Sequence, residues 1–393
     1  MSSASSVARS RAEPSRRTQR QCVVHRWLGR TIPAGPGGTL MRTMRREIIL
    51  RSTAVLAFCL LAALCLAAPH YAGAQQQVSI GFPPSHKLIV LSVPDKPAAL
   101  QVDLRQLSLQ DNTLRPEGNG ARLLAHDASW TLSAFAYPAD KTLSAQALRE
   151  QEWGGLRKAP VKATQVKTSE RGPMALLEYF VESFRGESIQ QKNVVAYLVS
   201  GDQWFDVHIS KVGYSPDDDV FFNSFLDGIK VIPNFQPGSA DRFRYGSFFY
   251  LQKKWPAAIE QYEKALDLER TKKELPQAEW RVLVDNLGMA YGMSGELQKA
   301  KRMFEFGITQ DPEYPMFHYN LACSDAELNN LDDALQDLKA AFRYRAHSIP
   351  GEGMPDPAKD SSFEKYVNDP RFKAVVEQLC PSSHQTPSGF LCD

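Results

Sequence analysis

The stretch that decides the fold of the second half of the chain is residues 287–312, LGMAYGMSGELQKAKRMFEFGITQDP. The same order of residue types returns 34 positions later, so that Gly288 corresponds to Ala322 and Ala300 corresponds to Ala334. Small residues at such positions let two helices approach closely, and the aromatic residues between them fill the shared layer. A repeat of this length therefore predicts consecutive pairs of antiparallel helices.

An earlier and less regular copy precedes these two. Gly246 lies 42 residues before Gly288, which implies an insertion of eight residues in the polar stretch 270–276. A 34-residue period with small and aromatic residues at fixed places is typical of one helical repeat. On these residues, the segment 239–346 resembles three tetratricopeptide repeats. The resemblance implies an all-α array of helical hairpins.

The resemblance also implies a concave groove, lined by the first helix of each repeat, that takes a peptide or helix of a partner protein. The outward positions of those helices are Phe243, Ser247, Tyr250, Asp285, Asn286, Met289, Tyr319, Asn320 and Cys323. Tyr250 and Asn286 are expected to lie outside the packing layer of the helix pairs. An alternative is that the aromatic members of this set pack against the N-terminal domain. The variant of the family that clamps a C-terminal carboxylate is not expected, because Phe243 stands where it needs a lysine.

Residues 347–393 are expected to form a capping helix, over 362–379, and a flexible tail, because the last repeat of an array needs a cover. Cys380 and Cys392 lie 12 residues apart in this tail. They could close a small loop in an oxidising compartment, or both could be free thiols.

Residues 41–74 have the three parts of a secretory signal peptide. Four arginines precede an apolar run of 15 residues, 54–68, and Ala72-Gly73-Ala74 stands before Gln75. Such a run rises only about 22 Å as a helix, less than the roughly 30 Å core of a bilayer. We expect Sec-type export with cleavage after Ala74, a periplasmic or secreted location, and no stable membrane span afterwards. Residues 1–40 are interpreted as an N-terminal extension ahead of a true start at Met41 or Met44.

Residues 1–74 differ from residues 75–393 in net charge. Residues 1–74 hold 11 arginines and two acidic residues, which leaves 35 Lys+Arg and 42 Asp+Glu for residues 75–393, a net charge of −7. A mildly acidic folded part does not favour nucleic acid as a partner, because nucleic-acid-binding proteins usually present a basic face.

Residues 78–232 have the pattern of an α+β domain. They predict an antiparallel sheet with helices on one face, a sandwich, which is followed by the all-α repeat array. The expected strands are 78–82, 88–93, 130–137, 175–184, 189–199 and 204–210, and the expected helices are 144–153 and 215–229. This order resembles the PsbP-like and DcrB-like sandwiches, which implies an accessory module without catalysis of its own.

Candidate catalytic groups were sought in this domain. Asp206, His208 and Ser210 alternate along one strand, but residues two apart lie about 6.5–7 Å apart, whereas a nucleophile and its base need about 2.6–3.2 Å. The three are interpreted as a solvated face of the sheet. The run of aspartates 217–219 is interpreted as a helix cap rather than a calcium site. The sequence predicts no catalytic residue, no metal and no cofactor.

The predicted function is that of an exported, non-enzymatic scaffold that binds a partner protein or peptide in its repeat groove. The alternative is an envelope accessory protein whose α+β domain holds a small apolar ligand or lipid. The sequence predicts no oligomeric state.

Overall fold

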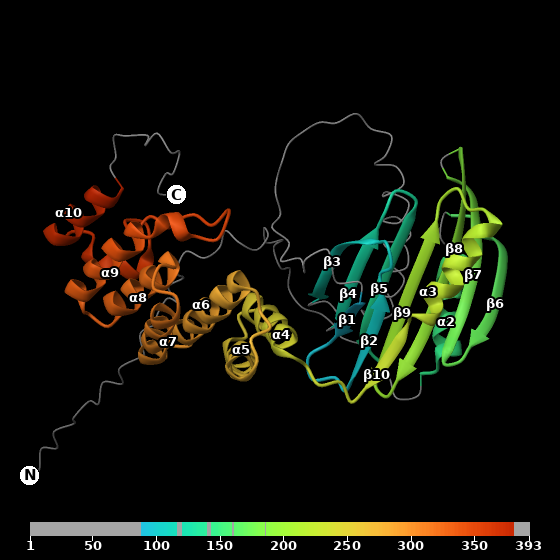
Figure 1. Ribbon diagram of the computed structural model, residues 1–393, viewed down its shortest axis with the longest axis horizontal. Helices are drawn as coiled ribbons and strands as arrows, with labels where there is room; N and C mark the ends of the chain where they lie inside the picture. The colour runs from blue at the N-terminus through green and yellow to red at the C-terminus, as the bar shows by residue number, and fades with distance from the viewer. Residues whose placement is uncertain (1–87, 116–119, 140–142, 159–160, 185, 381–393) are drawn as a thin grey trace, which may run out of the picture. The chain divides into compact units, whose positions relative to one another are not determined.

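The computed structural model describes residues 88–115, 120–139, 143–158, 161–184 and 186–380. The predicted extension, signal peptide, strand 78–82 and Cys392 lie outside these residues. The chain divides into two compact units at Leu275 and Pro276, and each unit is described by itself. The predicted fold class is confirmed: an α+β part with antiparallel sheets precedes an array of helices (Figure 1).

The first unit is built on a seven-stranded sheet in which every neighbouring pair is antiparallel. Its order is β3-β4-β5-β9-β8-β7-β6 (Figure 1). The strands are β3 (Ser108–Arg115), β4 (Gly120–His126), β5 (Trp130–Pro138), β6 (Thr164–Arg171), β7 (Met174–Phe184), β8 (Glu187–Ser200) and β9 (Gln203–Lys211). The expected meander of three strands is β7-β8-β9, and Gly201 makes its second turn at a φ of +60°.

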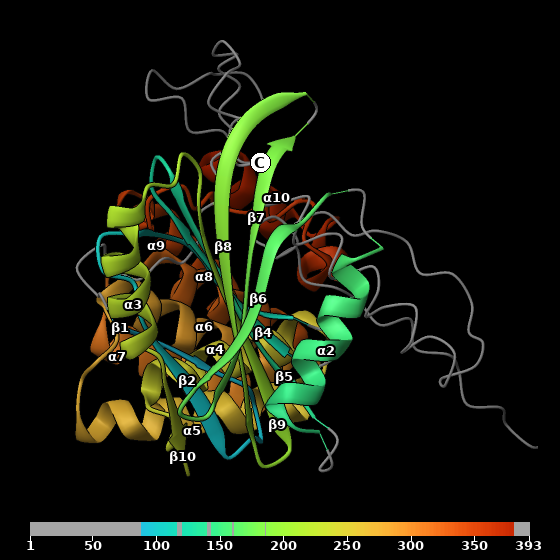
Figure 2. The same ribbon diagram turned by 90° about the vertical axis from the view of Figure 1, so that its right-hand side faces the viewer.

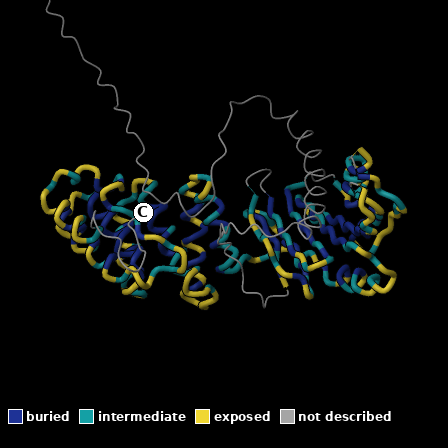
Figure 3. The backbone as a smooth tube through the Cα atoms, turned by 90° about the horizontal axis from the view of Figure 1, so that it is seen from above, coloured by how far each residue is buried: buried dark blue, intermediate teal, exposed yellow. Residues whose placement is uncertain are grey.

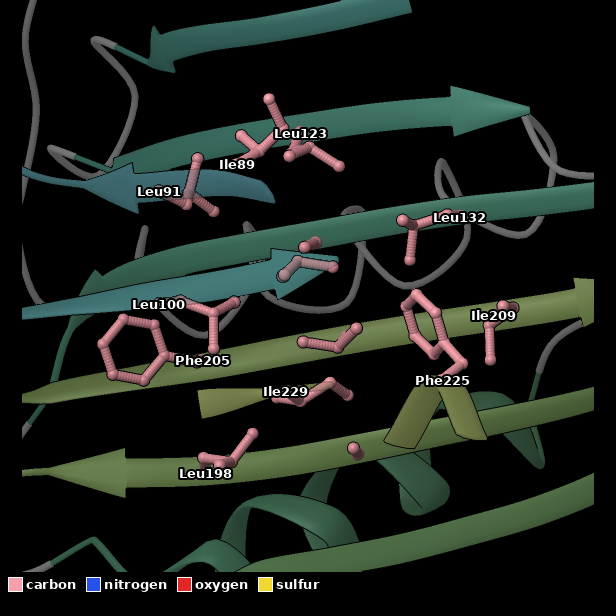
Figure 4. Close-up of a cluster of buried hydrophobic side chains, with 14 of the residues drawn as sticks. Ile89, Leu91, Leu100, Leu123, Leu132, Leu198, Phe205, Ile209, Phe225 and Ile229 are labelled. Atoms are coloured by element: carbon pink, nitrogen blue, oxygen red, sulfur yellow. The ribbon is translucent and has the colours of Figure 1, made fainter. Parts of the chain in front are cut away.

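A smaller sheet covers one face of the large one. It has the order β1-β2-β10, from β1 (Leu88–Ser92), β2 (Ala98–Asp103) and β10 (Lys230–Pro233). Helix α3 (Asp219–Asp227) contributes Phe225 to the same apolar core, where side chains of both sheets meet (Figure 4). Leu100 and Phe205 belong to this core and are fully buried. The domain is thus a sandwich, but its second layer is a small sheet together with α3, whereas the sequence predicted a single sheet covered by helices.

Helix α2 (Ala145–Leu156) lies on the other face of the large sheet (Figure 2). It buries Leu148 and Leu156 against Leu177 and Tyr197. The two helices of this domain therefore lie on opposite faces, whereas the sequence analysis placed them on one. The reason is the pleat: alternate residues of β7 and β8 are apolar on both sides, so both faces need a cover.

Side chains cap the starts of both helices of this domain that the structure describes, and one of these caps, the aspartate run, was predicted. The Ser144 hydroxyl accepts a hydrogen bond from the Ala147 amide at the start of α2. The Asp218 carboxylate accepts one from the Ser215 amide at 2.7 Å, just ahead of α3. The aspartate run therefore caps a helix, as expected.

Six helices form three antiparallel pairs. The first unit contains α4 (Ser239–Leu251) and α5 (Trp255–Thr271). The second contains α6 (Gln277–Met293), α7 (Leu297–Gln310), α8 (Pro315–Glu327) and α9 (Leu331–Arg343), followed by the 3₁₀ helix η5 (Ser361–Tyr366) and by α10 (Pro370–Leu379). In Figure 3 the buried residues follow the inner sides of the helices.

The division between units falls inside the predicted repeat segment 239–346 rather than at the linker near Pro233. The first pair is tied to the small sheet by side chains. Ser92 of β1 donates a hydrogen bond to Asp241 of α4 at 3.3 Å, and Arg244 of α4 donates one to the Ser92 hydroxyl at 3.2 Å. Tyr245 beside them is buried. These contacts group α4 and α5 with the sheets.

Glycine sets the spacing within the first two pairs, α4–α5 and α6–α7. A Cβ added at Gly246 would lie 2.3 Å from the Tyr262 ring, and one at Gly288 would lie 2.5 Å from the Phe304 ring. Both distances are too short for any side chain, so the partner ring packs directly on the helix backbone. The small residues that the sequence analysis aligned at Gly246 and Gly288 are therefore points of close approach.

We predict that Gly288→Ala destabilises the second unit. The methyl group would displace the buried Phe304 ring, and overpacking of this kind costs about 1–3 kcal/mol, against a helix-propensity gain of about 0.5–1 kcal/mol. Gly292→Ala is the matched control, because its Cβ would meet the Ala300 Cβ at an ordinary 3.8 Å in the same helix. Urea unfolding followed by circular dichroism should show a loss for the first variant and none for the second. Equal stability of the two variants would contradict this packing.

Candidate functional site

Helices α6 and α8 supply most of the predicted groove. Asp285, Asn286 and Met289 lie on α6, and Tyr319, Asn320 and Cys323 lie on α8. The side-chain amide of Asn320 donates a hydrogen bond to the Asp285 carboxylate at 2.7 Å, which joins the two helices. The structure thus brings Asp285 and Asn320 into direct contact. Asn286 is half-buried, and the other five are buried.

The cover over this side is the chain itself. We call residues 349–363, IPGEGMPDPAKDSSF, the strap. The Tyr314 hydroxyl, at the start of α8, donates a hydrogen bond to Glu352 Oε1 at 2.8 Å. The Tyr319 hydroxyl donates one to Asp360 Oδ2 at 3.1 Å. The predicted groove residues of α8 are therefore contacted by a segment that the sequence analysis assigned to the cap and tail.

Apolar contacts complete the cover. The Phe363 ring meets the Tyr319 ring edge-on, with centroids 6.3 Å apart, and stacks on Phe372 of α10 at 5.5 Å. Cys323 Sγ lies 3.9 Å from Asp360 Oδ2. Phe363 and Phe372 were expected to belong to the capping helix, and both are buried. The cap and the strap are thus one continuous cover.

Charges at the start of the strap are arranged around an arginine of α6. Arg281 makes two hydrogen bonds to Asp311, at 2.7 and 3.2 Å, and its guanidinium lies 4.7 Å from the centre of the Tyr314 ring. It also donates to the His347 carbonyl at 3.1 Å. Arg281 therefore holds the chain just ahead of the strap against α6.

Asp285 of α6 and Glu352 of the strap are two carboxyl groups that interact electrostatically. Burial raises the pKa of Asp285 to about 7, and the negative charge of Glu352 adds to the rise, although the hydrogen bond from Asn320 opposes it. Burial also raises the pKa of Glu352, against the hydrogen bonds that it accepts from Tyr314 and the Ile349 amide. The folded second unit therefore favours the protonated form of Asp285.

The remaining predicted groove residues lie on α4 in the first unit. Phe243 packs on the Tyr262 ring at 6.2 Å, and the Tyr262 hydroxyl donates to the Ser247 hydroxyl at 3.2 Å. Tyr250 meets Trp255 edge-on at 5.2 Å and also contacts Tyr262. The expectation that Tyr250 lies outside the packing layer is wrong, because its ring fills the space between α4 and α5.

The sheet contains a second polar cluster, which the sequence analysis interpreted as a solvated face. That interpretation is wrong: His208 and Ser210 are 5% and 1% exposed. The Tyr179 ring, which belongs to the core beneath α2, lies 6.4 Å from the His208 ring. His208 Nε2 bonds Asn193 Oδ1 at 3.0 Å. The signal that was missed is the row of tyrosines and valines on the neighbouring strands, which extends the apolar cover over these residues.

Burial changes the titration of this cluster. It lowers the pKa of His208 to about 4, so the imidazole is neutral at pH 7. It raises the pKa of Asp206 to about 8, with a smaller contribution from the charge of Glu152. Among the described residues, His208 bonds Asn193 and no hydroxyl group. The two residues therefore form a buried structural pair.

Within residues 88–380 and outside the gaps given above, no three His, Cys, Asp or Glu side chains gather as a metal site. Over the same residues, no helix is both long enough and apolar enough to cross a membrane. Cys380 is disulfide-bonded.

Comparisons with known proteins give likenesses among solved structures. No model of a known protein family matches the sequence, and no curated protein matches it. The chain is similar to the second TPR of Spaghetti (RPAP3) bound to an HSP90 peptide, with 20% identity and a TM-score of 0.24 over 27% of this chain and 91% of that one. It is also similar to the Sgt2 TPR domain from Aspergillus fumigatus, with 17% identity and a TM-score of 0.26 over 37% and 78%.

A third likeness is to LpqN, described as involved in cell envelope biogenesis of Mycobacterium tuberculosis. It has 10% identity and a TM-score of 0.20 over 39% of this chain and 83% of that one. The identities and TM-scores are all low, so no function is carried over from these proteins. The helical region is similar to tetratricopeptide repeats in its three helix pairs, and the PsbP-like or DcrB-like character of residues 78–232 stays a prediction.

We predict that the second unit loses stability as the pH rises from about 4 to about 7. The unfolded Asp285 carboxyl ionises near pH 4 and the folded one near pH 7, so the folded state holds the extra proton between these values. One such group lowers the free energy of unfolding by up to about 1.4 kcal/mol per pH unit in this window. Asp285→Asn, which keeps an acceptor for Asn320, should make the pH profile measured by urea unfolding less steep, while Asp337, whose pKa burial also raises to about 7, keeps its own contribution. The control Asp332→Asn, at an 85% exposed side chain, should not.

Proposed function

We propose that the protein is a non-enzymatic interaction protein that holds an extended segment of a partner protein against α6 and α8. The observation that supports this most directly is that the face already holds an extended peptide, the strap, through side-chain hydrogen bonds. Tyr314 and Tyr319 donate to its carboxylates, and Asn320 positions Asp285 beside it. A surface that binds one segment in this way has the chemistry to bind another.

The α6–α8 face has the mixture of aromatic and charged side chains expected of a protein-binding surface. Aromatic residues are enriched at the centres of protein interfaces, and Tyr314 and Tyr319 contact the strap from the start and the middle of α8. Arg281 supplies a fixed positive charge at one end, where it contacts the ring of Tyr314. We expect α4 and the sheets to act as the scaffold of the first unit, because the predicted groove residues of α4 are engaged in its own packing.

We further propose that the protein is exported and works outside the cytoplasm. The support is the signal-peptide pattern of residues 41–74, which lies outside the described residues. The alternative function, a small apolar ligand or lipid held by the α+β domain, stays a prediction. Both faces of the large sheet carry packed apolar clusters, so such a ligand would have to displace part of one.

A photo-crosslinking amino acid at position 286 tests the binding face in native cells. Asn286 is half-buried on α6, between Asp285 and Met289. The same amino acid at position 302, which is exposed on α7, is the matched control. We expect a discrete crosslinked protein from position 286 that is absent from position 302. The same products from both positions, or none from either, would overturn the proposed binding face.

Export has its own test. We predict that the mature protein begins at Gln75, because signal peptidase cleaves after a small-x-small sequence such as Ala72-Gly73-Ala74. N-terminal sequencing of the protein from the exported fraction checks this. A protein that keeps residues 41–74 in fractionated cells would contradict cleavage.

A further inference from the structure

The strap is an unusual element in a unit made of helices. From Glu352 to Asp356 it has neither helix nor strand, and turns at 350–351 and 357–359 flank this stretch. Prolines at 350, 355 and 357 restrict its backbone. Because proline removes conformational freedom from the free chain, ordering such a segment costs less entropy than ordering a flexible one. The strap therefore has the character of a peptide ligand rather than of a repeat helix.

Its anchors are spaced like the recognition residues of a ligand. Glu352 and Asp360 lie eight positions apart, and Phe363 follows three positions later. Each carboxylate accepts a hydrogen bond from a tyrosine hydroxyl of the face, at 2.8 and 3.1 Å. Hydrogen bonds to an ionised acceptor are roughly twice as strong as neutral ones. The strap is thus held at two carboxylates and at Phe363, while Met354 and Pro357 between the carboxylates are also buried.

The same contacts bury carboxyl groups, which makes the strap an energetically costly cover for the face. Asp360 is 3% exposed, and Glu352 brings a second carboxyl toward the buried Asp285. Burying carboxyl groups is expensive unless every partner is in place, and an apolar segment would cover the same face without that cost. Buried carboxylates that specify one binding register, at a cost in stability, are typical of recognition.

We propose that the strap is an exchangeable intramolecular ligand of the α6–α8 face, and that the partner is an extended protein segment with the same anchors: two carboxylates eight residues apart and an aromatic residue three positions after the second. This inference rests on the proposed function and deepens it by giving the partner's chemistry. Because the strap is tethered, its effective concentration is of millimolar order. A partner segment must therefore bind the open face more tightly than the strap does.

The test separates the two sides of the interface. A fluorescent peptide of residues 347–366 is added to the full chain, and its anisotropy is measured. In the strap-side variant Glu352→Ala/Asp360→Ala the face keeps its tyrosines but loses its tethered ligand. We expect this variant to bind the peptide and the parent chain to bind at least tenfold more weakly. A peptide with the same two alanines should bind neither.

Face-side substitutions supply the second arm. Adding Tyr314→Phe/Tyr319→Phe to the strap-side variant removes only two hydroxyl groups, and it should weaken peptide binding at least tenfold. Tyr262→Phe is the matched control, because it removes a tyrosine hydroxyl that bonds Ser247 in the other unit. It should leave peptide binding unchanged. Equal binding by all variants would overturn the proposal, because the peptide would then bind elsewhere.

Chemical labelling of Cys323 measures opening of the strap in the parent chain, without any substitution. Its thiol is 6% exposed, beside Asp360 of the strap. We expect maleimide labelling of Cys323, located by peptide mass spectrometry, to proceed under native conditions faster than global unfolding allows. Labelling only at the rate of global unfolding would show that the strap is a fixed part of the fold and would overturn the proposal. This labelling experiment tests the proposal even when the strap-side variant does not fold.

The possible outcomes separate strap exchange from the proposed partner-binding function of the α6–α8 face. Crosslinking at position 286 without peptide binding would leave the binding face in place and overturn strap exchange. Dimers of the strap-side variant that ignore the peptide would make a second copy of the chain the occupant, and they would also overturn the proposal. Peptide binding with no crosslink at position 286 would instead count against the cellular function of the face.

Discussion

The contact of an aromatic ring with bare helix backbone is the constraint on which the helical region depends. Tyr262 lies against Gly246 and Phe304 lies against Gly288, at distances that leave no room for a Cβ. Close contact fixes the separation of the two helices in each pair, since the ring cannot be compressed and the backbone cannot move away without losing its packing. In the second unit Gly288 sets the separation of α6 and α7, and Gly307 of α7 lies against the Phe317 ring of α8 in the same way. Asn320 of α8 reaches Asp285 of α6 across these packed helices. The side on which the strap lies is therefore built on close contacts between aromatic rings and glycine.

Much of this was accessible from sequence because the signal is periodic. The 34-residue spacing located three helix pairs, and apolar alternation located β5, β7, β8 and β9. The strands β3 and β6 were missed because they are edge strands, SLQDNTLR and TQVKTSER, whose polar residues hide the alternation. Strand β10 was missed because four residues are too few to show a period. Strands β2 and β4 were also not predicted, although both lie in the interior of their sheets. The conformation of the edge strands and of the short β10 is decided by a neighbouring strand rather than by their own composition.

The candidate site was predicted less completely, for a related reason. Helical position identifies which residues of α6 and α8 point away from their paired helices, and Asp285, Tyr319 and Asn320 do share one side. It cannot identify what lies over them, because the strap has no periodicity and its anchors are recognised only through the tyrosines that they meet. The same holds for His208, whose burial depends on Tyr179 of another strand. Pairing between distant segments is information that no local pattern contains.

The attachment of α4 to β1 has a consequence for how the molecule can be divided. A repeat boundary would cut the chain near residue 239, and that cut would expose the side of α4 that carries Tyr245 and the Asp241–Arg244 pair bonded to Ser92. The boundary between the two compact units lies one repeat later, between Leu275 and Pro276. The repeat that resembles its successors in sequence thus belongs by packing to the domain before it, so the sequence repeats and the compact units of the structure have different borders in this chain.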